Sequence, residues 1–101
     1  PTNQHLYEML VNDVRHTLRM AFDDKEERSK AVSYLFKTFL RAMLINYGVF
    51  NKDRLLEMFK SKYPQIDLPK NSGEILNRKV NEEDFRDVLK FSDNCLRELI
   101  K

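Results

Sequence analysis

The two histidines, His5 and His16, are the residues best suited to bind a metal ion. They are eleven positions apart in a segment with helical periodicity, so about 16 Å would separate them along the helix axis. One metal ion cannot span that distance. Asp13 could pair with His16 across one turn, but zinc sites take three or four ligands. We therefore predict no metal site and no cofactor.

The single cysteine and the densest cluster of carboxylates are the other side chains that could take part in catalysis. Cys95 lies on the apolar face of its segment, whereas a reactive thiol needs an electropositive, partly exposed setting. Glu82, Glu83 and Asp84 follow a capping residue, where carboxylates stabilise the helix dipole. Glycine-rich phosphate loops, nucleophile elbows and His-Glu-x-x-His motifs do not occur in the sequence. We predict no catalytic residue and no enzymatic activity.

The composition is typical of one small helical domain. Of 101 residues, 42% are hydrophobic and 34% charged, with two glycines and three prolines. So few turn residues favour long helices over sheets. Having one cysteine and no disulfide favours an intracellular location, nuclear or cytoplasmic. No apolar run approaches the roughly 18–20 residues of a membrane span, so we expect no membrane partner.

The first two helices are predicted from apolar residues that recur with a period of 3.6. Residues 3–22 have one apolar stripe and a polar opposite side. Residues 24–47 are apolar on most sides, which is typical of a central helix that others surround. Gly48 follows as a left-handed C-cap. The stripe of the first helix consists of Leu6, Leu10, Val14, Leu18 and Phe22.

A third helix is predicted over residues 51–63. Asn51 stands at the N-cap position, and Phe50 and Leu55 have the spacing of a hydrophobic staple. Pro64 ends the helix.

An irregular stretch and a fourth helix complete the chain. Residues 64–78 are rich in Pro, Asn, Asp, Ser and Gly, with a short helical turn expected near residues 74–77. The fourth helix begins after Asn81 as N-cap and continues to residue 101. The predicted fold is all-α: a four-helix compact domain, residues 1–101, with the second helix at its centre. Because the chain begins at Pro1 and its last residues are helical in pattern, we expect it to be part of a longer protein.

Positive charge is locally concentrated in residues 51–81. The net charge is only +2, but residues 51–81 carry seven bases and four acids. Local positive charge is typical of surfaces that contact phosphates. The candidate nucleic-acid contacts are Lys52, Lys60, Lys62, Lys70, Arg78 and Lys79.

A second basic group lies on the predicted fourth helix. Its members fall within about 60° of arc on the solvent side, an arrangement that both phosphate-tracking surfaces and plain solvated faces show. They are Arg86, Lys90, Arg97 and Lys101.

The segment FLRAMLINYGVFNKDRLLEMF, which starts at Phe39, reads as helix, glycine turn, capping residue and helix. Over residues 34–63 it resembles the first two helices of a winged-helix or helix-turn-helix unit. The resemblance implies a third helix, either the fourth predicted helix or the turn near residues 74–77, and a β-wing. It also implies a place in a transcription or nucleic-acid-handling assembly, although such units serve as protein docking surfaces too.

A competing surface lies on the first helix. Met9 and Met20 fall outside the apolar stripe, beside His5 and His16. Methionines outside the core form adaptable contact patches, so these four residues are candidates for binding a protein partner or a second copy of the chain.

The leading prediction is a non-enzymatic, helix-turn-helix-like module that binds nucleic acid. The alternatives are a docking or dimerisation domain that uses the first helix, and an accessory domain of a larger enzyme.

Overall fold

The computed structural model describes residues 2–20, 24–48 and 51–101, and these residues form helices and connecting segments without any β-strand. The prediction of an all-α fold is confirmed. In chain order the elements are α1 (Asn3–Met20), α2 (Lys25–Met43), the 3₁₀ turns η1 (Ile45–Tyr47) and η2 (Lys52–Arg54), α3 (Leu55–Lys62), α4 (Ser72–Leu76) and α5 (Glu82–Leu99).

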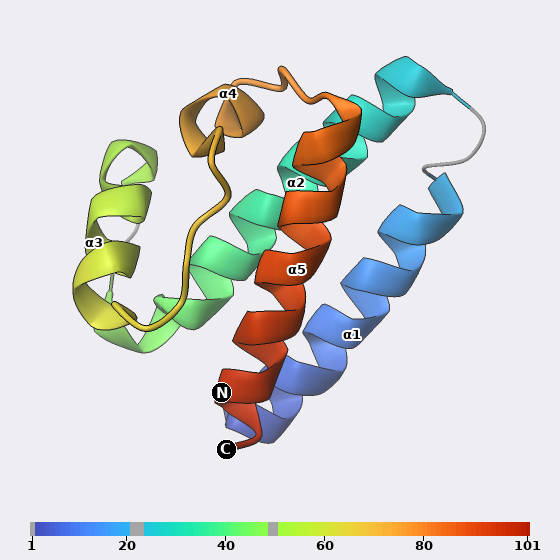
Figure 1. The fold of residues 1–101 in the computed structure, drawn as a ribbon. Coiled ribbons are helices and arrows are strands. Elements are labelled where there is room, and N and C mark those ends of the chain that lie inside the picture. The colour runs from blue at the N-terminus through green and yellow to red at the C-terminus, as the bar shows by residue number, and fades with distance from the viewer. Residues whose placement is uncertain (1, 21–23, 49–50) are drawn as a thin grey trace.

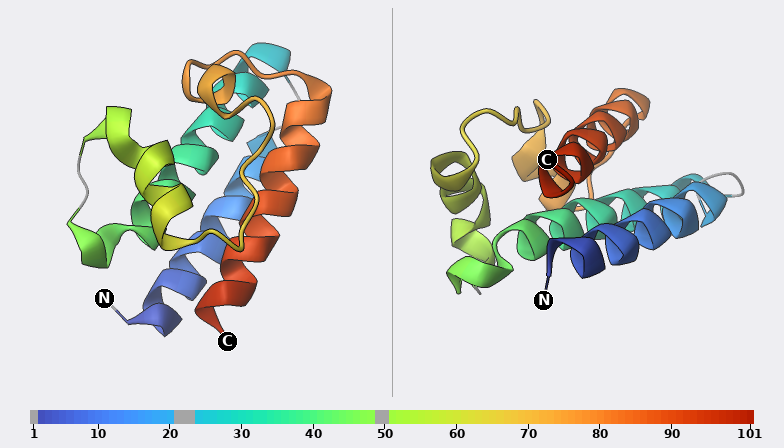
Figure 2. Two further views of the ribbon diagram at one scale, coloured as in Figure 1. Left: turned by 60° about the vertical axis from the view of Figure 1, so that its left-hand side comes forward. Right: turned by 90° about the horizontal axis from the view of Figure 1, so that it is seen from below.

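Three long helices, α1, α2 and α5, lie side by side and contact one another pairwise (Figures 1 and 2). The short helices α3 and α4 both pack on α2. Because α2 contacts every other α-helix, the prediction of a central second helix is confirmed. The segment after α3 returns toward α5 and so closes one side of the domain (Figure 2). No helix within the described ranges is both long and apolar enough to cross a membrane.

Four phenylalanines from three helices form the centre of the core. Phe36 and Phe39 come from α2, Phe59 from α3 and Phe91 from α5, and each is at most 1% exposed. The ring of Phe91 lies 5.2 Å from those of Phe36 and Phe59 and 6.5 Å from that of Phe39. Aromatic pairs in edge and tilted orientations stabilise beyond the area they bury. Phe91 therefore joins α5 to both α2 and α3.

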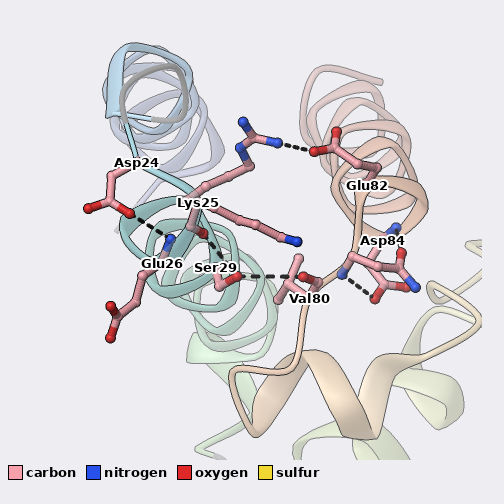
Figure 3. Close-up of polar contacts among 9 residues, drawn as sticks. Asp24, Lys25, Glu26, Ser29, Val80, Glu82 and Asp84 are labelled. Carbon is pink, nitrogen blue, oxygen red and sulfur yellow. Dashed lines mark hydrogen bonds and ion pairs between the residues drawn. The ribbon is translucent and has the colours of Figure 1, made fainter.

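Polar contacts join the first turns of α2 and α5 (Figure 3). The carboxylate of Asp24 caps α2 by accepting a hydrogen bond from the backbone N–H of Glu26 at 2.8 Å. Across the junction, Arg28 forms an ion pair with Glu82. The Ser29 hydroxyl lies 3.5 Å from the carbonyl oxygen of Val80.

The predicted cap of the last helix is confirmed. Asn81 Oδ1 accepts from the backbone N–H of Asp84 at 2.8 Å, and Asp84 Oδ2 accepts from the N–H of Asn81 at 3.0 Å. This reciprocal pair is a capping box, which satisfies two donors that the helix itself leaves free. Upstream, the expected turn near residues 74–77 is the five-residue helix α4.

The junction between α2 and α3 differs in detail from its prediction. Gly48 has the expected left-handed backbone, with φ of 68°, but it ends η1 because α2 already stops at Met43. Asn51 Oδ1 accepts from the N–H of Asp53 at 3.0 Å, so it caps η2, and α3 begins only at Leu55. Phe50, the other half of the predicted staple, lies outside the described residues.

The buried side of α1 is shifted from the predicted stripe. Leu6 and Leu10 are buried as expected, but the third buried position is Thr17, while Leu18 is only half-buried. Thr17 follows Leu6 by three helical turns and so lies on the same line. Its hydroxyl donates to the carbonyl of Asp13 at 2.9 Å, which offsets the cost of burying it. Phe22, at the end of the predicted stripe, is outside the described residues.

Candidate nucleic-acid interface

A hollow of about 720 Å³ lies between α3, residues 67–73 and α5. Basic side chains line it from all three elements: Lys60 from α3, Lys70 from the connecting segment and Lys90 from α5. Its apolar wall consists of Leu56, Leu68, Pro69 and Phe91. The structure thus brings together two of the six predicted contacts, Lys60 and Lys70, and adds Lys90 from the basic group of the last helix.

Of the three lysines that line this hollow, only Lys70 forms an ion pair among the described residues. Lys70 Nζ lies 3.5 Å from a carboxylate oxygen of Glu83, and both side chains are exposed, so this pair contributes little to stability. Within the described ranges, Lys60 and Lys90 form no ion pair. Asp67 and Asp87 also line the hollow.

Asp87 has an unused acceptor in the wall of the hollow. Its Oδ2 is buried and has no hydrogen-bond partner among the described residues. A buried acceptor without a partner is costly, so a ligand that brings an N–H donor to this point would stabilise it.

The other predicted contacts lie elsewhere. Lys62 Nζ stands 4.8 Å from the centre of the Tyr47 ring and does not line the hollow. Lys79 lines a separate depression with Glu74 and Asp84. Arg78 lies against α2, as described below, and the side chain of Lys52 is outside the described part of the chain. The five candidates whose side chains the structure describes therefore do not all line one hollow.

The sequence already placed Lys90 on the outward arc of α5 with Arg86 and Arg97, although it was not among the six predicted contacts. All three side chains are exposed. Arg97 donates to Asp93 Oδ2 at 2.9 Å, whereas Arg86 has no ion pair in the residues that the structure describes. Periodicity placed these three residues together, but only the tertiary structure brings Lys60 and Lys70 to the same hollow as Lys90.

The candidate partner surface on α1 is exposed. Met9 retains 45% of its accessible surface and Met20 retains 39%, and His5 and His16 are exposed as well. By helical periodicity the four side chains fall within about 60° of arc. Burial raises the pKa of the neighbouring Asp13, and His16 opposes that shift. A ridge of two thioethers and two imidazoles thus runs along α1.

The side chains that were considered for chemical reactivity belong to the core or to structural contacts. Cys95 is fully buried, and its burial raises the pKa of the thiol, so the thiolate is disfavoured at neutral pH. Asp84 belongs to the capping box and Glu82 to the ion pair with Arg28. Within residues 2–20, 24–48 and 51–101, no three His, Cys, Asp or Glu side chains are grouped so that they could hold a metal ion.

The chain matches no protein-family model, and searches of curated proteins and of solved structures found no similar protein.

Proposed function

We propose that this domain is a non-enzymatic binding module that contacts nucleic acid across the hollow between α3 and α5. The observation that carries the proposal is the meeting of Lys60, Lys70 and Lys90 from three elements on one concave surface. Contacts between lysines and phosphates supply most of the affinity of such modules. Lys60 and Lys90, which form no ion pair in the described residues, are the principal phosphate contacts.

The exposed side of α5 extends this surface. Arg86 and Arg97 share the outward arc of Lys90, so a phosphate backbone could follow the helix from the hollow in either direction. The exposed pair between Arg97 and Asp93 is weak enough for a phosphate to displace. In the helix-turn-helix interpretation, α2, the Gly48 turn and α3 are the first two helices with their connection, and α5 takes the place of the third helix.

Reversing the charge of Lys60 and Lys90 together is expected to weaken nucleic-acid binding about tenfold or more. The measurement is fluorescence anisotropy with a labelled duplex and a labelled single strand at about 50 and 200 mM salt, where phosphate contacts are most evident. Loss of two contacts should also reduce the slope of log affinity against log salt by about 2 for the duplex.

The matched control is Arg15→Glu with Lys25→Glu, which changes the net charge equally at two exposed positions that do not line the hollow. Equal loss of affinity in both double variants would reduce the effect to net charge and contradict the proposed site. The absence of any binding by the native domain at the lower salt concentration would contradict the function itself.

A second candidate function is self-association or protein docking through α1, and the exposure of Met9 and Met20 favours it. Met9→Asp with Met20→Asp is expected to abolish a dimer, measured by sedimentation equilibrium. The fold should survive, because surface substitutions usually change the free energy of unfolding by no more than about 0.5 kcal/mol. Asn3→Asp with Asn12→Asp adds the same charge to α1 and should leave the dimer intact. A monomeric native domain would exclude self-association, and a double methionine variant that still dimerises would exclude Met9 and Met20 as its contact surface.

A further inference from the structure

A second basic hollow, of about 270 Å³, lies on α2 and shares no residue with the hollow between α3 and α5. Four of its residues belong to α2, and Arg78 reaches it from the segment between α4 and α5. No carboxylate is among the described residues that line it. They are Lys30, Ser33, Tyr34, Lys37 and Arg78.

The fold places these groups together for two reasons. Lys30, Tyr34 and Lys37 are spaced by four and three positions, which puts them on one face of α2. Helix α4 packs on α2, and Arg78, two residues beyond the end of α4, therefore lies beside that face. Arg78 has a left-handed backbone, with φ of 64°, because it ends α4: its N–H donates to the carbonyl of Ile75, and the N–H of Lys79 donates to that of Glu74.

The side chains around this hollow suit a phosphate. Arg and Lys are the side chains that bind phosphate oxygens most strongly. Lys30 Nζ lies 3.7 Å from Glu27, but both partners are about half exposed, so a phosphate can compete with that pair. Ser33 is 1% exposed, and its hydroxyl has no hydrogen-bond partner in the part of the chain that the structure describes. The residues lining the hollow thus include a buried hydroxyl without a partner among the described residues.

The ring of Tyr34 adds a second element of recognition. This side chain retains 66% of its accessible surface, although aromatic rings of this size are usually at least half-buried. An exposed aromatic ring beside basic side chains is the combination with which proteins stack a nucleobase while holding its phosphate. The volume of the hollow is below the roughly 300–1,000 Å³ of sites that enclose a whole ligand. A phosphate therefore fits inside, with the base lying over Tyr34 at the rim.

We infer that this hollow binds a nucleotide, with the phosphate among Lys30, Lys37 and Arg78 and the base stacked on Tyr34. The inference does not depend on the proposed function, because the two hollows have no residue in common. The nucleotide could be a free mononucleotide or one unit of a single strand, and the experiment below distinguishes the two.

The test is a titration of the ¹⁵N-labelled chain with AMP and, separately, with inorganic phosphate, followed by amide chemical shifts. The signals of residues 30–37 and 78 are expected to shift with a dissociation constant for AMP of about 1 mM or tighter. Lys30→Gln with Arg78→Gln should weaken AMP binding at least about tenfold, since two charged contacts are lost. Tyr34→Leu should weaken AMP binding roughly fivefold or more but leave phosphate binding unchanged, because only the base loses its contact.

The matched control is Lys25→Gln with Lys79→Gln, which removes two positive charges from α2 and from the residue next to Arg78 without touching this hollow. Arg78→Gly is a further variant, because it removes the guanidinium at a backbone angle that suits glycine and so preserves the turn. The Lys60→Glu, Lys90→Glu variant should bind AMP as tightly as the native chain, because neither residue lines this hollow. This result would separate the site from the proposed interface.

The inference is overturned if AMP shifts no signal at these residues, if the control pair weakens binding as much as Lys30→Gln with Arg78→Gln, or if Tyr34→Leu weakens AMP and phosphate equally. A tetranucleotide that binds more tightly than AMP, with the same Tyr34 dependence, assigns the site to a strand. Binding no tighter than that of AMP assigns it to a free nucleotide.

Discussion

Phe91→Ala is expected to lower the free energy of unfolding by about 3–5 kcal/mol. Phe91 is 1% exposed, and its ring contacts phenylalanines from α2 and α3. Removing it leaves a cavity at the point where α5 meets both helices, and close-packed interiors relax only partly into such a space. Since domains of this kind are stabilised by only about 5–15 kcal/mol in total, the variant should unfold at a much lower concentration of denaturant. The measurement is equilibrium unfolding in urea, followed by circular dichroism.

Tyr34→Ala is the control, because it removes an aromatic ring of similar size from a side chain that is 66% exposed. It should change the free energy of unfolding by no more than about 0.5 kcal/mol. A cost for Phe91→Ala below about 1 kcal/mol would mean that α5 does not pack on α2 and α3 through this ring.

Asp84→Ala is expected to cost about 2 kcal/mol, more than the loss of an ordinary surface carboxylate. Asp84 is 2% exposed, and each of its carboxylate oxygens accepts a hydrogen bond. One bond, from the N–H of Asn81, completes the capping box, and the other comes from Asn71 Nδ2 at 2.9 Å. Because Asn71 immediately precedes α4, the substitution should also release α4 from the start of α5. Urea unfolding gives the cost, and faster hydrogen exchange of the α4 amides reports the release.

Glu83→Ala provides the comparison within the same helical turn. Glu83 is exposed, and its pair with Lys70 is solvent-accessible on both sides, so its removal should cost no more than about 0.5 kcal/mol. Equal costs for the two substitutions would show that the bonds from Asn71 and Asn81 to Asp84 contribute no stability.

The features that could be predicted from the sequence depend on residues close together in the chain. The N-cap at Asn81 and the left-handed Gly48 are determined by side chains and backbone within one helical turn, and both are confirmed. The central position of α2 was predictable because a helix that is apolar on most sides has to be surrounded. The burial of Cys95 followed in the same way from its place on an apolar face.

The parts of the fold that could not be predicted depend on which helix faces which. Periodicity places Phe91 on the apolar side of its helix, but it cannot say that this ring meets Phe36 and Phe59. Thr17 was missed because a threonine is a weak apolar signal, and only the packing of α1 shows that its position is buried. The end of α2 at Met43 was also missed, since η1 continues the same apolar pattern with tighter turns.

The same division holds for the candidate sites. The sequence alone determined that residues 51–81 have an excess of basic residues and that α5 has a basic outer arc, because these are properties of composition and helical period. The tertiary structure decided that Lys60, Lys70 and Lys90 line one hollow while Lys62 lies over Tyr47. It also placed Arg78 beside Lys30 and Tyr34, residues that are more than forty positions away in the chain. Charged residues that far apart in the sequence come together only because hydrophobic burial sets the path of the backbone. The pattern of charges in the sequence does not predict that path.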